Sequence, residues 1–151
     1  MKNALCYMGV LLIITNESLA WQSQKNKRQT YAYEPTSAIL IGTIETQTFP
    51  GPPNYESITN VDKTERGWFI KLDRAIDVAP GPQTNIANQE PEKNVQIVQV
   101  AIHNDKLWGK LKDGLRCKIK GALFHRLTGH HHARVLVFAE DFEPVVGENE
   151  K

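Results

Sequence analysis

Histidines are the residues of this sequence whose type and spacing could do the most chemistry. His125 precedes the turn Arg126–Gly129, and His130, His131 and His132 follow it. If the flanking segments pair as a hairpin, His125 lies opposite His130, and the two-residue period of a strand puts His132 on the same face. Directly opposed β-carbons lie about 5 Å apart. The imidazoles of His125, His130 and His132 could therefore converge on a zinc, copper or nickel ion.

The same histidines also fit a hairpin that holds no metal. His131 is expected to point to the opposite face, and we count it with Thr128 as a candidate ligand-binding residue. Imidazoles at a hairpin tip also pair with carboxylates or backbone groups, and they titrate near neutral pH. The sequence has no H-E-x-x-H motif, so metal binding stays an alternative; Glu56 would be the fourth ligand of a structural site.

A second segment with recognition chemistry is rich in proline. Three prolines and one glycine occupy positions 50–53, which disfavours both a helix and a strand ladder. We expect a loop over residues 45–65 and another over 73–93. Loops longer than about 12–15 residues are often functional. The candidate ligand-binding side chains of the first loop are Phe49, Tyr55, Glu56 and Ser57.

Basic and aromatic residues give a third pattern. Arg116, Lys118 and Lys120 alternate along one expected strand, and Trp68 lies in another. Single-stranded nucleic acid binders combine such residues. The net charge of +1, from 18 basic and 17 acidic residues, argues against a nucleic-acid partner. Trp68 remains a candidate ligand-binding residue, while the basic stripe is either a solvated face or a site for an anionic glycan, a lipid headgroup or an acidic protein.

The N-terminal residues have the pattern of an export signal. Lys2 precedes an apolar run of 12 residues, 4–15, and Ala20 ends a short stretch typical of a cleavage site. We expect cleavage after Ala20 and a periplasmic or secreted protein. Because a membrane-spanning helix needs about 20 apolar residues, we expect no stable membrane anchor after cleavage. Cys6 would leave with the signal, and Cys117 would remain as a buried thiol.

The periodicity predicts an all-β fold with one short helix. Strands are expected over residues 38–44, 67–72, 95–102, 115–125 and 134–139, and Asn104 or Asp105 is expected to cap the helix. Three strands, a helix and two strands are the pattern of the oligonucleotide/oligosaccharide-binding (OB) fold, a five-stranded Greek-key barrel. Gly42 and Gly121 fit points where barrel strands bend. A small β-sandwich is the alternative, although an immunoglobulin-like one has about seven strands.

These elements define the expected organisation of the chain. Residues 1–20 are a signal peptide, 21–34 a flexible polar lead-in, 35–143 a single OB-like domain and 144–151 a frayed tail. Ligands of OB barrels meet the second and third strands and the loops that follow the first and fourth strands. In this chain those loops are 45–65 and 125–132, which we therefore expect to form one recognition surface.

Three strings carry a family resemblance: FPGPPNYES at 49–57, GWF at 67–69 and TGHHH at 128–132. With them the chain resembles a family of small exported bacterial proteins known only as a domain of unknown function. The resemblance spans about residues 33–140. It implies a bacterial periplasmic or secreted protein, and it implies neither an activity nor any site residue.

The sequence favours a non-enzymatic role and assigns no catalytic residue and no certain cofactor. It contains no G-x-S-x-G elbow, no phosphate-binding G-x-x-x-x-G-K-[ST] loop and no G-x-G-x-x-G turn. We expect a binding module for an unknown periplasmic ligand or protein. The alternatives are a transition-metal-binding protein that uses the histidines and an inhibitor or immunity-type protein that masks another protein.

Overall fold

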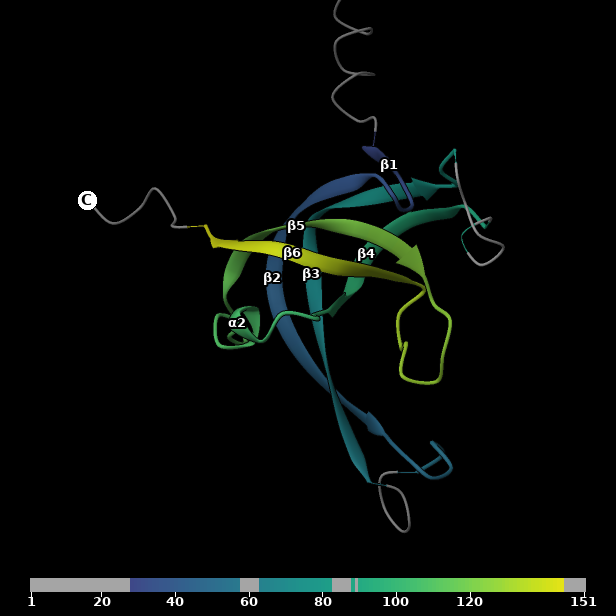
Figure 1. Cartoon of the computed structure of the whole chain (residues 1–151), viewed down its shortest axis with the longest axis vertical. Coiled ribbons are helices and arrows are strands. Elements are labelled where there is room, and N and C mark those ends of the chain that lie inside the picture. The colour runs from purple at the N-terminus through teal and green to yellow at the C-terminus, as the bar shows by residue number, and fades with distance from the viewer. Residues whose placement is uncertain (1–27, 58–62, 83–87, 89, 146–151) are drawn as a thin grey trace, which may run out of the picture.

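The computed structural model describes residues 28–57, 63–82, 88 and 90–145. The elements in chain order are β1 (Thr30–Ala32), β2 (Ser37–Pro50), β3 (Thr64–Ala79), β4 (Glu92–Ala101), α2 (Asp105–Trp108), β5 (Arg116–His125) and β6 (Val135–Pro144) (Figure 1). From β2 onward this is the expected order of three strands, a helix and two strands. The predicted signal peptide lies outside the described residues, as do residues 21–27 of the lead-in and 146–151 of the tail.

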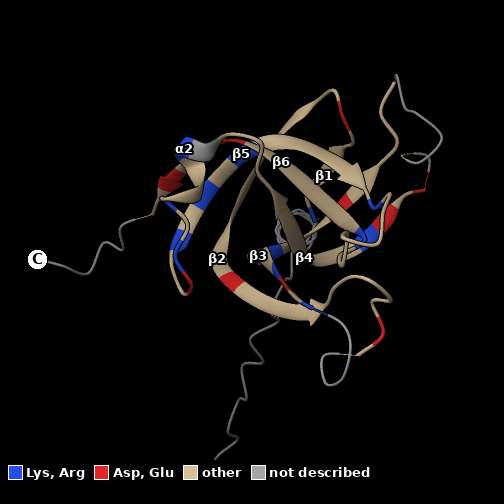
Figure 2. Cartoon of the chain, turned by 60° about the horizontal axis from the view of Figure 1, so that its bottom comes forward, with Lys and Arg blue, Asp and Glu red and all other residues tan. Residues whose placement is uncertain are grey.

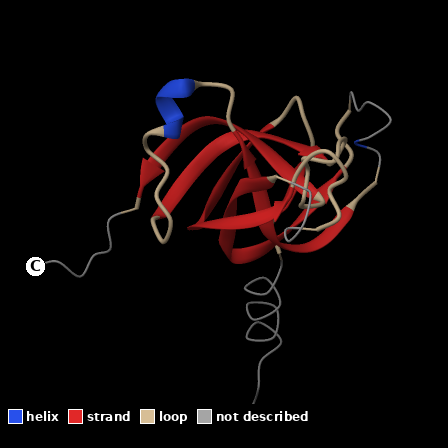
Figure 3. Ribbon diagram, turned by 90° about the horizontal axis from the view of Figure 1, so that it is seen from below, coloured by secondary structure: helices blue, strands red, loops and turns tan. Residues whose placement is uncertain are grey.

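The strands from β2 to β6 close into a barrel. β3 pairs with β2 and with β4, and β5 pairs with β2 and with β6, all antiparallel. A parallel pairing of β4 with β6 completes the circuit (Figure 3). The predicted all-β class with one short helix and an OB-like barrel is confirmed, and the chain does not form the alternative sandwich.

Alternating side chains of the five barrel strands fill the interior. Along β2, for example, Leu40 and Ile44 are buried, and they pack in one cluster with Ile70, Val98 and Ile119. β2 and β3 stay paired well beyond this core, as far as Pro50 opposite Thr64, and Figure 1 shows their ends extending below the barrel. This extension carries the proline-rich loop on a rigid two-stranded arm.

Two glycines let strands approach each other closely. A β-carbon at Gly42 would lie 2.1 Å from the carbonyl oxygen of Lys71, and one at Gly121 would lie 2.0 Å from that of Phe138. The pairing of β5 with β6 also shifts register between Lys120 and Gly121. Glycine is therefore required at both positions because any side chain would collide with the neighbouring backbone.

The structure corrects the expected lengths of both long loops. β2 continues to Pro50 and β3 begins at Thr64, so the first loop is 51–63 rather than 45–65. Pro50 is tolerated because it is the last residue of the ladder, where the missing N–H costs least. β3 continues to Ala79 because Ile76 and Val78 enter the core, which shortens the second loop as well.

The expected flexible lead-in is wrong for its last residues. Thr30 to Ala32 pair in parallel with Asp77 to Ala79 of β3, which adds β1 outside the closed barrel. The next residue, Tyr33, is fully buried. The surrounding polar residues hid this short apolar alternation in the sequence.

The connection from β4 to β5 holds the short helix α2. Of the two expected caps, Asn104 is the one: its side chain accepts a hydrogen bond of 3.0 Å from the backbone N–H of Lys106. Among the described residues, no helix is long and apolar enough to cross a membrane.

Candidate functional site

The proline-rich loop and the histidine loop meet at one end of the barrel. The Tyr55 hydroxyl lies 3.2 Å from Nε2 of His130, and the two rings make an edge-to-face contact with centroids 5.4 Å apart. On its other side, Nδ1 of His130 lies 2.8 Å from Oε2 of Glu65. A neutral imidazole with its proton on Nδ1 satisfies both contacts, since it donates to the Glu65 carboxylate and accepts from the tyrosine hydroxyl.

A second contact between the same segments is an aromatic stack. The Phe49 ring lies parallel to the imidazole of His132, with centroids 3.7 Å apart and planes 4° apart. The ring of Phe69 in β3 also contacts Phe49, with the two centroids 5.7 Å apart. The Nε2 atom of His132 is buried without a hydrogen-bond partner among the described residues and lies 3.9 Å from Oε1 of Glu65. Burial lowers the pKa of His132, and the negative charge of Glu65 opposes that shift.

Gln99 of β4 anchors the histidine loop to the barrel. Its amide nitrogen donates to the carbonyl of His130 at 2.9 Å. Its amide oxygen accepts from the backbone N–H groups of His132 at 2.6 Å and Ala133 at 3.2 Å. Gln99 is also the first β4 residue to pair with β6. The Gln99 side chain thus takes the place of backbone hydrogen bonds between β4 and the histidine loop, just before the pairing of β4 with β6 begins.

His131 and Thr128 shape the turn of this loop. Nδ1 of His131 accepts from the backbone N–H of Leu127 at 2.8 Å, and the His131 N–H donates to the Thr128 carbonyl at 3.1 Å. The ring packs edge-on against Phe124, 5.5 Å away. Burial lowers the pKa of His131, with further contributions from His130 and His132. These contacts hold the imidazole neutral because Nδ1 must keep its lone pair to accept.

The predicted convergence of three histidines is wrong in its geometry. His125 lies opposite Val135, not His130, because β5 ends at His125 and the loop runs to residue 134 before β6 begins. The His125 ring instead contacts Glu92, with 3.3 Å between Nε2 and Oε1. Within the part of the chain that the structure describes, no group of three or more His, Cys, Asp or Glu residues is placed to hold a metal ion.

Two acidic residues, Glu65 and Glu92, contact the histidines although the sequence did not identify them as site residues. We expected Glu56 to approach the histidines, but Glu56 is exposed on the proline-rich loop, and Glu65 is the carboxylate beside His130 and His132. Glu92 serves both His125 and Arg134, whose guanidinium lies 3.4 Å from the second carboxylate oxygen. The signal for Glu65 was its position directly after the loop, opposite Phe49 in a longer hairpin.

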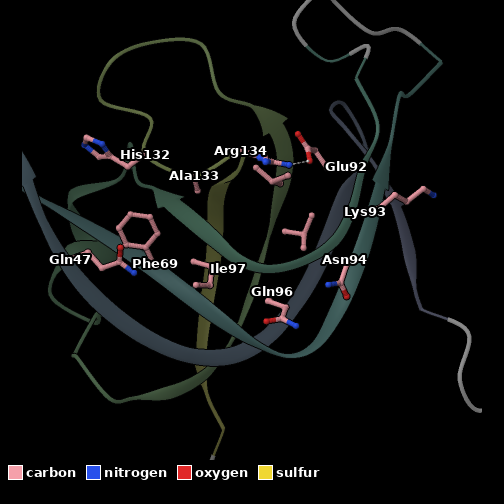
Figure 4. A pocket seen from close by; sticks show the side chains of 12 residues that line it. Gln47, Phe69, Glu92, Lys93, Asn94, Gln96, Ile97, His132, Ala133 and Arg134 are labelled. Carbon is pink, nitrogen blue, oxygen red and sulfur yellow. Dashed lines mark hydrogen bonds and ion pairs between the residues drawn. The ribbon is translucent and has the colours of Figure 1, made fainter. Parts of the chain in front are cut away.

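A groove of about 350 Å³ opens next to the histidine loop. One wall is the outer half of β4, from Glu92 to Ile97, and the other is the chain from His132 to Val135 (Figure 4). Phe69 and Gln47 complete its lining. The largest share of its lining comes from β4, the third barrel strand, with Phe69 from β3, the second; OB folds bind their ligands on these two strands.

Other predicted residues lie outside this groove. Trp68 is half-buried and packs against the barrel core, and Ser57 is exposed on the proline-rich loop. Cys117 is buried as expected, and burial raises the pKa of its thiol to about 11.

The basic stripe on β5 is largely paired with acidic side chains. Arg116 lies 2.7 Å from Asp73 and Lys118 forms an ion pair with Glu143. Figure 2 shows these basic positions along β5 with acidic residues nearby. This arrangement fits the solvated-face interpretation of the stripe better than a polyanion site.

Comparisons with known proteins add no relative. No family model matches the chain, and searches among curated proteins and solved structures found no match. The resemblance to a family of exported proteins thus stays a prediction from the motifs, and function must be argued from the site.

Proposed function

We propose that the chain is a non-enzymatic binding module whose recognition surface combines the proline-rich loop, the histidine loop and the groove between the histidine loop and β4. Its ligand would be met outside the cytoplasm, since the N-terminal residues have the pattern of an export signal. The bacterial family suggested by the motifs fits the same location.

The observation that carries this proposal is the contact chain from Tyr55 through His130 to Glu65. It fixes two loops that are far apart in the sequence into one surface before any ligand arrives. Preorganisation of this kind lowers the entropy that binding must offset. Amide, carboxylate, guanidinium and aromatic groups all line the adjacent groove, which is the mixture typical of a specific ligand site.

The test uses two probe collections, a glycan array and a random linear peptide display library, with the protein lacking residues 1–20. We expect a ligand whose affinity falls at least about tenfold, or ~1.4 kcal/mol, in Phe49→Ala and His130→Ala. Lys110→Ala is the matched control, because Lys110 is exposed beside α2. Ligands that bind all three variants equally would overturn the proposal.

A transition-metal protein is the second candidate, favoured by one observation. Nδ1 of His130 and Nε2 of His132 face the two oxygens of the same carboxylate, at 2.8 Å and 3.9 Å. Imidazole and carboxylate are common zinc ligands. In the described chain these three side chains contact one another and do not form a ready ligand set, so a metal ion would have to displace the contact between His130 and Glu65. Elemental analysis of untagged protein purified without nickel resin tests it. Stoichiometric metal that is lost in Glu65→Gln would favour this candidate over the metal-free module.

A further inference from the structure

We infer that a second groove, on the outer face of β1, β2 and β3, binds a single-chain anionic amphiphile: an alkyl chain that carries a carboxylate or similar anionic head. This groove has a volume of about 940 Å³ and shares no lining residue with the groove beside the histidine loop. The inference does not depend on the proposed function of the two loops.

Strand β1, which is not part of the closed barrel, creates this groove. β1 pairs only with β3 among the described strands and lies outside the closed circuit. Tyr31 of β1 reaches across to β2, where its hydroxyl donates a hydrogen bond of 2.5 Å to the carbonyl of Ile39. Burial raises the pKa of this hydroxyl. β1 thereby forms a wall that turns a convex barrel surface into a concave one.

The floor of the groove is apolar and exposed. Ile39 is 50% exposed and Ile41 is 42% exposed, although both lie within β2. The buried side chains of Leu72 and Ile76 continue the apolar lining towards β3. Exposed apolar side chains in a concave site are typical of a surface that a ligand covers.

Arginines surround this floor. Arg28, Arg74 and Arg116 line the groove, against Asp73 as the single acidic lining residue. Arg28 and Arg116 each contact one aspartate, whereas the structure gives Arg74 no ion pair within the described chain. Because a guanidinium has five N–H donors, all three arginines can still donate to an anionic head.

A chain-like ligand fits this combination better than a protein surface does. Stable protein interfaces cover about 800 Å² on each partner and have a broad apolar centre. Here the exposed apolar area is restricted to two isoleucines inside a groove. An alkyl chain can lie along Ile39 and Ile41 while its head meets Arg74. The groove therefore suits a single amphiphile molecule better than a protein surface.

The test is titration of the protein lacking residues 1–20 with laurate below its micelle-forming concentration, followed by calorimetry and by ¹H–¹⁵N spectra. We expect saturable binding that shifts the amides of Ile39, Ile41 and Arg74. Ile39→Ser with Ile41→Ser should weaken binding about tenfold or more, and Arg74→Gln should weaken it about fivefold. Both changes are at exposed side chains, so the fold should persist.

Two matched controls separate the groove from general hydrophobicity and charge. Ile97→Ser changes an isoleucine that is 41% exposed in the other groove, and Arg66→Gln changes an exposed arginine on the hairpin arm. Neither should alter laurate affinity. Dodecyltrimethylammonium, with the same chain and a cationic head, should bind much more weakly. No saturable laurate binding, equal binding of the cationic amphiphile, or shifts centred on Ile97 would each overturn the inference.

Discussion

The Tyr55 hydroxyl and the His130 imidazole, 75 positions apart in the chain, lie 3.2 Å from each other. Each belongs to a different loop, and each loop is carried by a different pair of barrel strands. The long arm of β2 and β3 brings Tyr55 to this place, and Gln99 holds the backbone of His130. The barrel therefore positions the proline-rich loop and the histidine loop so that Tyr55 and His130 meet.

This coupling is measurable in a double-mutant cycle. Tyr55→Phe and His130→Ala remove the same contact, so the sum of their effects on the free energy of unfolding should exceed the effect of the double variant by about 0.5 kcal/mol or more. Urea unfolding provides the measurement. Tyr55→Phe combined with Lys110→Ala is the control pair, and it should be additive. Additivity in both pairs would show that Tyr55 and His130 do not interact.

Gln99 should matter more than its polar neighbours on β4. Gln99→Leu leaves the partly buried backbone groups of His130 and His132 without partners, and we expect a loss of about 1–3 kcal/mol in the free energy of unfolding. Gln96→Leu, at an exposed position of the same strand, should change it by less than about 0.5 kcal/mol. Hydrogen exchange of residues 130–133 would show whether the loop loosens first. Equal effects of the two substitutions would contradict this role.

Glycine should be irreplaceable at two strand positions and replaceable in the histidine loop. Gly121→Ala and Gly42→Ala place a β-carbon against backbone oxygens, which should cost about 3 kcal/mol or prevent folding. Gly129→Ala meets nothing within 4 Å and should be nearly neutral. Thermal unfolding of the three variants tests this. A stable Gly121→Ala protein would mean that β5 and β6 are further apart than described.

Asp77 should make stability depend on acidic pH. The backbone N–H of Asn94 is the main cause of a lowered Asp77 pKa, and Arg28 and Lys93 add to it while burial opposes it. Because the folded pKa is below the ordinary value of 3.8, this stabilisation is complete above about pH 5 and is lost as pH falls through the folded pKa. Urea midpoints between about pH 5 and pH 2 should fall more steeply for the wild type than for Asp77→Asn. Parallel curves would refute the contribution.

Much of the fold could be predicted because each barrel strand contains an apolar run and clear breaks separate these runs. The position of the helix between the third and fourth barrel strands was enough to indicate the barrel. β1 was missed because Tyr31 and Tyr33 stand among polar residues, and its pairing depends on β3, far along the chain. The end of β2 was misplaced because a proline usually indicates a loop. Pro50 is nevertheless the last residue of the β2–β3 ladder, where no N–H is needed.

The site was predictable only in part, for a related reason. The expected meeting of the proline-rich and histidine loops follows from barrel topology, and Phe49, Tyr55, His130 and His132 do lie together. His125 was misplaced because the loop length between β5 and β6 decides which residue lies opposite it. Glu65, Glu92 and Gln99 are single polar residues in strands, and only the three-dimensional register shows which way each points.

The central claim is that both loops belong to one binding surface. The most direct measurement is a ¹H–¹⁵N titration of the protein lacking residues 1–20 with the tightest ligand recovered from the glycan array or peptide library. We predict that the amides of Tyr55, His130 and His132 shift together with one dissociation constant. Shifts in one loop alone, or on a face remote from both loops, would contradict the claim.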